Sequence, residues 1–276
     1  MKTRRDFLRN ASAATLVPVL SSFSPQESVD TPSAVLGIAG YSFNHYQSDI
    51  SKAIDVLKQV DIRDITLKNF QLPYEATSEE AGKIISRFRE AGIRVYGLGV
   101  IYMKSAEEVD NAFAYAGRAG VSMIVGSPLP ELLSRAETRA RETQIKLAIH
   151  NHGPEDKVYP DIDTIAAHIR KLDPLIGICL DIGHSFRCGH NPADMLRSYA
   201  PRVIDMHIKD VTVQKPDGES TIPGRGVLPL REVFQMVRKS GYRGICSLEY
   251  ERPGDPAAGI AESIGYLRGL VKGLGN

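Results

Sequence analysis

The 276-residue sequence has almost no net charge, few cysteines and no long hydrophobic run. Lysine and arginine number 34 against 33 aspartates and glutamates, so a net charge of +1 provides no overall field that would attract nucleic acid or an anionic membrane. The three cysteines are an odd number: Cys179 and Cys246 lie in apolar, strand-like runs, and Cys188 lies in an expected loop. A disulfide framework is therefore not expected.

The first 33 residues differ in composition from the rest of the chain. Residues 3–9 read TRRDFLR, and residues 11–23 form a mildly apolar stretch that is too short and too rich in Ser, Ala and Thr to span a bilayer. This pattern resembles a twin-arginine export signal, which implies a bacterial periplasmic protein that folds before export. A basic tail without export function is the alternative. We expect residues 1–33 to be an export signal and linker, residues 34–276 to be one catalytic domain, and no membrane association after export.

From residue 34 onward, short β-like runs alternate with amphipathic helical runs. The expected strands are Val35–Tyr41, Asp64–Asn69, Arg94–Val100, Ser122–Val125, Lys146–Asn151, Ile176–Asp181, Val203–Ile208 and Gly244–Tyr250. Several are continuously apolar, as strands covered on both faces should be. Helix start signals are the patterns Thr77-x-x-Glu80, Ser105-x-x-Glu108 and Asn191-Pro192.

Eight such βα units without an intervening linker predict an α/β protein with a single closed (β/α)8 TIM barrel. A doubly wound open sheet is the alternative, but no G-x-G-x-x-G loop follows the first strand. Only the segment Ser220–Leu230 breaks the alternation, and it is a candidate cover for the barrel mouth.

Four consecutive expected strands end in side chains that bind metals: His150, Asp181, His207 and Glu249. In a parallel barrel these strand ends meet at one end of the molecule, where TIM-barrel chemistry takes place. Two imidazoles and two carboxylates suit one divalent ion such as Mn, Fe, Co, Ni or Zn, and suit Mg or Ca less well. Four ligand-type residues on four successive strands favour a metal site over four separate structural residues.

Alternation along a strand leaves some of these choices open. His150 and His152 share a face, so the sequence alone does not decide which of them binds the metal. Glu249 and Glu251 also share a face, and Glu249 is preferred because it lies deeper in its strand. Asp210 either orients Lys209 or takes part in the chemistry.

Over residues 34–272 the chain resembles the xylose isomerase-like TIM barrels, the sugar phosphate isomerase/epimerase superfamily. The matching elements are the Asp181-x-x-His184 motif, His207 within MHIKD, Glu249 within SLEYE, and the HNHG run that begins at His150. The resemblance implies one metal held at the ends of strands five to eight, with His184 in contact with the substrate.

One position departs from the family pattern. The well-studied epimerases have a glutamate where this chain has His150, and that glutamate acts together with the strand-eight glutamate. Imidazole remains a good metal ligand. The substitution therefore preserves the predicted metal site but argues against a two-glutamate epimerisation.

We therefore expect a metal-dependent isomerase or epimerase that acts on a sugar or keto-sugar through an enediolate. Candidate proton-transfer residues are Glu249, His152, Lys209 and Glu155, and candidate substrate-binding residues are His184 and Lys68. If a β-hydroxyl or β-alkoxyl group leaves instead, the enzyme is a keto-sugar lyase or hydratase. A non-catalytic sugar-binding barrel is a further alternative. The expected partner is a small-molecule sugar and not nucleic acid, and an oligomer is possible.

Overall fold

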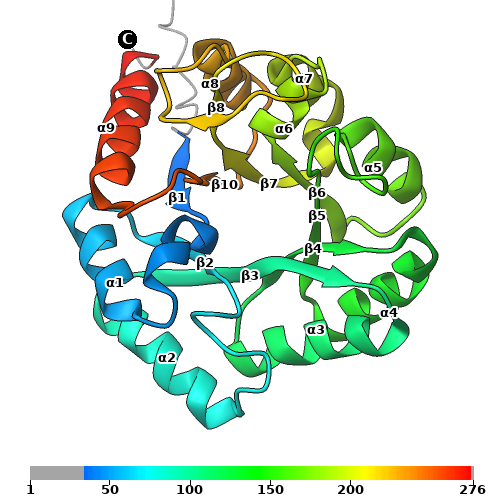
Figure 1. Cartoon of the computed structure of the whole chain (residues 1–276). Helices are drawn as coiled ribbons and strands as arrows, with labels where there is room; N and C mark the ends of the chain where they lie inside the picture. The colour runs from blue at the N-terminus through cyan, green and yellow to red at the C-terminus, as the bar shows by residue number, and fades with distance from the viewer. Residues whose placement is uncertain (1–33, 275–276) are drawn as a thin grey trace, which may run out of the picture. The chain divides into compact units, whose positions relative to one another are not determined.

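The computed structural model describes residues 34–274, and eight parallel strands within them form a closed barrel (Figure 1). The barrel strands are β1 (Val35–Ile38), β2 (Asp64–Leu67), β3 (Arg94–Met103), β4 (Met123–Pro128), β5 (Lys146–His150), β6 (Ile176–Asp181), β7 (Val203–Ile208) and β10 (Ile245–Leu248). The first strand, β1, pairs with both β2 and β10 and thereby closes the barrel. The predicted (β/α)8 fold is confirmed.

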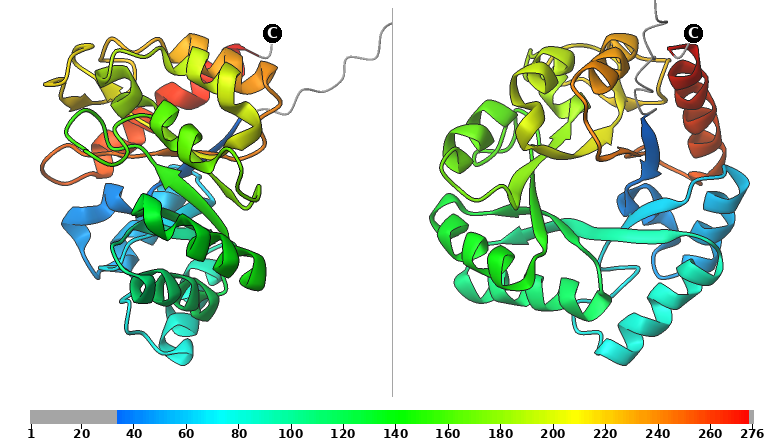
Figure 2. Two further views of the ribbon diagram at one scale, coloured as in Figure 1. Left: turned by 90° about the vertical axis from the view of Figure 1, so that its right-hand side faces the viewer. Right: turned by 180° about the vertical axis from the view of Figure 1, so that it is seen from behind.

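Helices connect successive strands and surround the barrel (Figures 1 and 2). They are α1 (Ile50–Gln59), α2 (Ser78–Glu90), α3 (Ala106–Ala119), α4 (Leu133–Thr143), α5 (Ile162–Ile169), α6 (Ile182–Arg187), α7 (Pro192–Tyr199), α8 (Leu230–Lys239) and α9 (Ala257–Gly273). Short 3-10 helices span Gly40–Tyr46, Pro130–Leu132 and Ala200–Arg202. Across residues 34–274, no helix has the length and apolar character needed to cross a membrane.

Two of the predicted helix caps form completely and one forms in part. Thr77 and Glu80 make a reciprocal capping box at the start of α2, and the Asn191 side chain accepts from the Ala193 amide at the start of α7. Ser105 accepts from the Glu108 amide, but the Glu108 carboxylate accepts from Lys104 instead of from Ser105. The sequence patterns therefore placed these helix starts correctly.

The hydrophobic core lies between the strands and the helices around them. Strands β2, β4 and β6 are buried at every position, as expected for parallel strands with both faces covered. Phe88, Phe113 and Phe234, from α2, α3 and α8, are among the largest fully buried side chains. Cys179 and Cys246 are buried and form no disulfide, in agreement with their interpretation as small core residues.

The segment that follows β7 contains an element that was not predicted. Strands β8 (Asp210–Val211) and β9 (Ser220–Thr221) pair as a short antiparallel ribbon. The Asp210 carboxylate then accepts from the amides of Gly224, Gly226 and Leu228 at 2.9–3.0 Å. Asp210 therefore anchors this loop, a role that differs from both alternatives drawn from the sequence, orientation of Lys209 or a part in the chemistry.

The centre of the same loop contacts the last helix of the barrel. The Arg225 guanidinium pairs with the Glu262 carboxylate of α9, with Nη2 2.8 Å from Oε2. The loop expected to cover the mouth is therefore tied to α9.

Candidate active site

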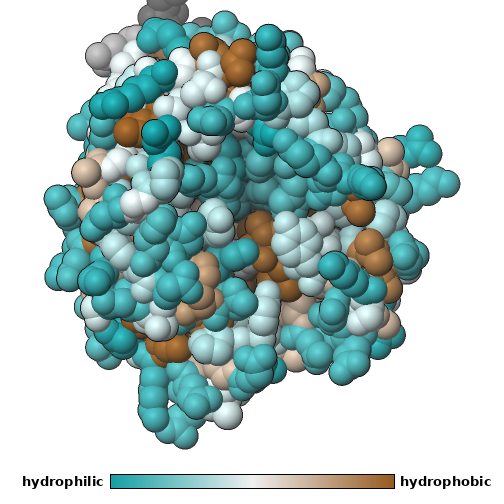
Figure 3. Space-filling view, viewed as in Figure 1, coloured by the Kyte–Doolittle hydropathy of each residue, from teal (hydrophilic) through white to brown (hydrophobic). Residues whose placement is uncertain are grey.

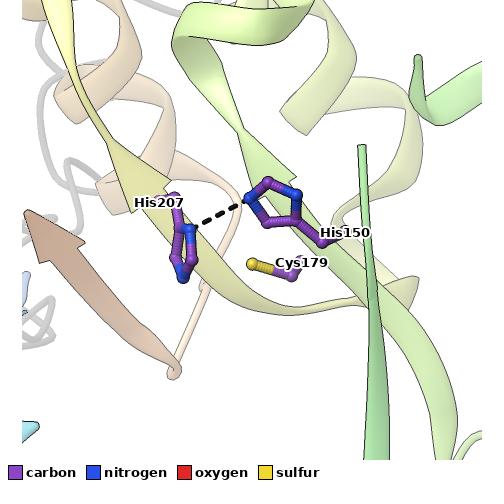
Figure 4. Close-up of side chains that lie close together, drawn as sticks. All are labelled: His150, Cys179 and His207. Atoms are coloured by element: carbon purple, nitrogen blue, oxygen red, sulfur yellow. Dashed lines mark hydrogen bonds between the residues drawn. The ribbon is translucent and has the colours of Figure 1, made fainter. Parts of the chain in front are cut away.

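Four side chains from successive strand ends converge inside the barrel. His150 Nε2 lies 3.0 Å from His207 Nδ1 and 3.4 Å from Asp181 Oδ2, and His207 Nδ1 lies 3.2 Å from Glu249 Oε2. One donor atom from each of the four residues lies within 4.8 Å of the others. Tetrahedral ligands about 2.1 Å from an ion are about 3.4 Å apart, so the spacing suits one metal ion. Figure 4 shows a ring nitrogen of His150 directed at a ring nitrogen of His207, with the Cys179 thiol close to both rings.

The charge of the cluster also suits a divalent cation. Lys209 Nζ lies 3.1 Å from Asp181 Oδ2, 2.8 Å from Glu249 Oε2 and 3.0 Å from Glu251 Oε2. Three carboxylates and one ammonium leave two negative charges formally uncompensated. The four side chains that form the cluster are only 0–5% exposed, so water screens these charges poorly.

Three of the four cluster residues have pKa shifts toward the protonation states that a metal site requires. The fourth, His207, differs: burial lowers its pKa, but the carboxylates of Glu249, Asp205 and Asp181 outweigh burial and raise it, an effect that a bound cation would oppose. Burial alone would raise the pKa of the Asp181 carboxyl, but Lys209 and the neighbouring histidines hold it below its usual value. Glu249 is likewise held well below its usual pKa, in spite of burial, by His207 and Lys209. Burial lowers the pKa of His150, so this imidazole is neutral near pH 7.

Asp181 has two tasks in the Asp-x-x-His motif. Its Oδ1 accepts from the His184 amide at 2.8 Å and so caps α6, while its Oδ2 faces the cluster. The first turn of α6 then presents the His184 ring, whose Nε2 lies 3.4 Å from Lys209 Nζ. Burial, together with the Lys209 charge, lowers the pKa of His184 to about 3, so this ring is neutral.

Lys209 is a buried cation at the centre of the site. Burial opposes its charge, but the carboxylates of Asp181, Glu249 and Glu251 outweigh that effect and raise its pKa well above the usual value. A group in this state stays charged, donates hydrogen bonds and does not act as a base. Burial also raises the pKa of the Glu251 carboxyl, and for a carboxyl group this shift favours the neutral form.

His152 lies next to the cluster without belonging to it. Its Nε2 is 2.9 Å from the Tyr102 hydroxyl and its Nδ1 is 3.2 Å from Asp156 Oδ2, while its ring lies 4.5 Å from the His150 ring. Burial and the proximity of His150 lower its pKa to about 4. The geometry thus separates the two histidines of the HNHG run: His150 faces the other ligands, and His152 is a neutral imidazole beside them.

The two remaining predicted site residues make their hydrogen bonds and ion pairs outside the cluster. Glu155 forms an ion pair with Arg187 and its side chain is 63% exposed, so it lies at the rim. Lys68 donates from Nζ to the Val100 carbonyl at 3.1 Å, and burial lowers its pKa. The structure therefore brings seven of the nine predicted residues together, four in the cluster and three beside it: His152, His184 and Lys209.

Asn151 is a site residue that the sequence did not reveal. Its Oδ1 accepts from the Asp181 amide at 2.9 Å and its Nδ2 donates to the Asp181 carbonyl at 3.1 Å. Because Asn151 is fully buried, these contacts fix the backbone of β6 where Asp181 points into the cluster. Its position between two histidines suggested only a residue turned away from the site.

Asp205 was also missed. Its Oδ2 lies 4.0 Å from His207 Nε2, and its Oδ1 accepts from the Tyr96 hydroxyl at 3.3 Å. Burial raises the pKa of this carboxyl to about 7. The available signal was alternation, since Asp205 and His207 are two residues apart on β7 and share a face. Burial and Asp205 raise the pKa of the adjacent Cys179 thiol well above its usual value, which argues against a thiolate ligand.

The face of the molecule that contains these strand ends is hollowed near its centre, where hydrophilic residues predominate (Figure 3). A closed (β/α)8 barrel with ionisable side chains gathered at the carboxyl ends of its strands is the architecture of a TIM-barrel enzyme. More particularly, the chain belongs to the xylose isomerase-like TIM barrel family, to which residues 48–270 match. The family resemblance drawn from the sequence is confirmed.

Two relatives illustrate this kinship. The inosose dehydratase of Lacticaseibacillus casei is 28% identical over 142 residues, which are 45% of this chain and 46% of the relative, so this chain matches less than half of that protein's length. The inosose dehydratase of Clostridium beijerinckii is 24% identical over 255 residues, covering 84% of this chain and 83% of the relative. Among solved structures, the IOLI protein with a bound zinc atom has a similar fold, with a TM-score of 0.73 at 14% identity over 86% of this chain and 98% of that one.

Proposed function

We propose that the protein is a divalent-metal-dependent lyase that acts on a keto-sugar or a keto-cyclitol. In this reaction a proton leaves the carbon next to the carbonyl, and a hydroxyl or alkoxyl group leaves the following carbon. The observation that supports it best is the placement of two groups beside the cluster: the neutral His152 imidazole, whose ring lies 4.5 Å from the His150 ring, and the Lys209 ammonium, whose Nζ lies 2.8 Å from Glu249 Oε2. An elimination needs one group that accepts the proton from carbon and one group that donates a proton to the leaving oxygen.

His150, Asp181, His207 and Glu249 would hold the ion. When bound, the ion supplies Lewis-acid charge that stabilises the enediolate produced by loss of the α-proton. Two imidazoles and two carboxylates suit Mn, Fe, Co, Ni or Zn. The zinc atom described in a protein of similar fold is consistent with this group of ions.

The chain's own residues supply the proton transfers. His152 Nε2 accepts the α-proton in place of its hydrogen bond with the Tyr102 hydroxyl, and Asp156, 3.2 Å from Nδ1, stabilises the imidazolium that results. Lys209 donates to the departing oxygen, and its neighbour His184 binds a substrate hydroxyl. The histidine at position 150 leaves the site without the second catalytic glutamate that epimerisation in this family uses, and both relatives described above are named as dehydratases.

Isomerisation or epimerisation is the second candidate function. It requires a group that returns the proton to carbon, and the Glu251 carboxyl is one option because burial raises its pKa. Glu251 also lies 3.0 Å from Lys209, which connects it to the same cluster.

The test is incubation of the metal-loaded protein with an inosose and with 3-keto-sugars in D2O, followed by NMR and ultraviolet absorbance. An unsaturated ketone formed with loss of water or alcohol supports the lyase. Deuterium at the α-carbon without elimination supports the isomerase, and no exchange with any of these substrates contradicts both. His152→Ala should lower the rate by about 10²-fold or more. The control is His168→Ala, an exposed histidine on α5.

A further inference from the structure

A pocket of about 370 Å³ lies between the loop that follows β2, the end of β3 and one side of α3 from Glu108 to Arg118. Its aromatic and polar lining includes Tyr74, Glu75, Tyr102, Glu108, Asn111 and Arg118. Tyr102 lies at the carboxyl end of β3 and Glu108 in the first turn of α3, so this part of the pocket is on the same end of the barrel as the cluster, and the rest of the pocket continues along α3. Its volume is within the range of small-molecule sites.

Tyr102 connects this side pocket to the candidate active site. Its hydroxyl lies 2.9 Å from His152 Nε2, and the two rings stack at a centroid distance of 5.2 Å. The His152 ring in turn lies 4.5 Å from the ring of His150, one of the four cluster residues. A ligand in the side pocket therefore contacts the same tyrosine that touches the candidate base.

The walls of the side pocket are held in place by side chains that pack beneath the loop. Arg118 donates from Nε to the Ala76 carbonyl at 2.9 Å and from Nη2 to the Tyr74 carbonyl at 2.7 Å. The Tyr115 hydroxyl donates to the Leu72 carbonyl, and the Tyr115 ring meets the Tyr74 ring edge-on at 5.0 Å. These contacts fasten the loop to α3, so the pocket exists before a ligand arrives.

The chemistry of the lining selects a neutral, hydroxyl-rich ligand. Tyr74 and Tyr102 are 37% and 52% exposed, and their rings offer flat apolar surfaces beside polar groups. The carboxylates of Glu75 and Glu108 and the amide of Asn111 can bind hydroxyl groups. Two carboxylates against one guanidinium disfavour an anionic ligand, and a second sugar ring has the required combination of apolar face and hydroxyl edge.

We propose that the side pocket is a second carbohydrate subsite, and that the substrate is a keto-disaccharide whose reacting ring lies at the metal cluster. This inference rests on the proposed lyase function. The bond between the α-carbon and hydrogen breaks and its electron pair becomes the carbon–carbon double bond, while the β-carbon–oxygen bond breaks. The second sugar leaves with that oxygen, which takes a proton and becomes a hydroxyl group. The leaving ring is the one held by the side pocket.

The experiment separates binding in the side pocket from the reaction. Unreactive cellobiose, maltose, trehalose and sucrose are titrated against the metal-loaded protein by saturation-transfer NMR, with methyl β-glucoside and methyl α-glucoside as single-ring references. We expect at least one disaccharide to bind about tenfold more tightly than both references. In the pocket variants Asn111→Leu and Tyr74→Ala this advantage should disappear, whereas Glu107→Gln, an exposed neighbour on α3, should retain it.

The outcomes are distinct. If no disaccharide binds more tightly than the methyl glucosides, or if both pocket variants keep the wild-type affinities, the subsite does not exist. This conclusion holds whether or not the protein reacts with keto-sugars. Conversely, a disaccharide preference that depends on Asn111 and Tyr74 supports the subsite even if the reaction is isomerisation, because no step of the chemistry enters the binding measurement. Circular dichroism establishes that each variant is folded.

Discussion

At the scale of single residues, the two histidines at the end of β5 should respond differently to mutation. His150 lies 3.0–3.4 Å from other donor atoms of the cluster, while His152 contacts Tyr102 and Asp156. We expect His150→Ala to lose bound metal, and His152→Ala to keep the metal but lose proton exchange. Elemental analysis after dialysis, paired with deuterium exchange by NMR, measures both.

The comparison has an internal reference in Asp181→Ala, which should also lose the metal. Equal metal content in the His150→Ala and wild-type proteins would show that the ion binds elsewhere. If His152→Ala lost the metal and His150→Ala kept it, His152 would be the metal-binding residue and His150 the candidate base.

The same residues show how far a sequence can predict a site. Strand alternation and strand order suffice to bring His150, Asp181, His207 and Glu249 together, because parallel strands end at one edge. They do not separate His150 from His152, since both face the same way, and the separation depends on partners from β3 and from the loop after β5. Asn151 and Asp205 were missed because their importance lies in hydrogen bonds to other strands.

At the scale of an element, the contribution of the Asp161 cap at the start of α5 to the stability of the protein should depend on pH. Its Oδ1 accepts from the Thr164 amide at 2.9 Å, and its pKa is lowered because these hydrogen bonds outweigh burial. A lowered pKa means that the contribution to stability is complete above the unfolded value of about 3.9 and is lost as the pH falls through the folded value. Asp161→Ala should cost about 1 kcal/mol at pH 7 and less at pH 3, measured by urea unfolding.

An uncharged cap serves as the control. Asn191 caps α7 through the Ala193 amide at 2.9 Å, so the cost of Asn191→Ala should be the same at pH 7 and at pH 3. A cost of Asp161→Ala that does not change with pH would contradict the role of its charge.

The loop after β9 depends on one carboxylate. Asp210→Ala would remove the acceptor for the amides of Gly224, Gly226 and Leu228. We expect a loss of about 2 kcal/mol in the free energy of unfolding and faster proteolysis within residues 221–229. Asp217→Ala, an exposed position in the preceding turn, is the matched control, and equal proteolysis of the two variants would count against the anchor.

Elements were predictable where their sequence pattern was long enough. The helix caps and the parallel strands followed from periodicity and from local signals. The ribbon of β8 and β9 did not, because two-residue strands contain no period and are held by pairing alone. Strand β3 continues three residues beyond its predicted end, where Ile101–Met103 pair with Gly126–Pro128 of β4.

At the scale of the whole molecule, the export prediction concerns residues 1–33, which lie outside the described residues. We propose that this segment directs the folded protein to the periplasm. Residues 1–33 fused to a fluorescent protein should place fluorescence in the periplasmic fraction, and the double change of Arg4→Lys and Arg5→Lys should abolish this. Arg9→Lys is the control, and export of the double variant at the wild-type level would refute the signal.

The closure of the barrel by β1 has a consequence for biosynthesis. Val35 is paired with Ile245, so the first strand has one of its two neighbours only after the last strand has left the ribosome. The sheet therefore remains open, with an unpaired edge on β1, until β10 has been synthesised. Closure joins distant parts of the chain, which makes it slow. If a protein of this topology is transported in its folded form, its barrel must first close in the compartment where it is synthesised.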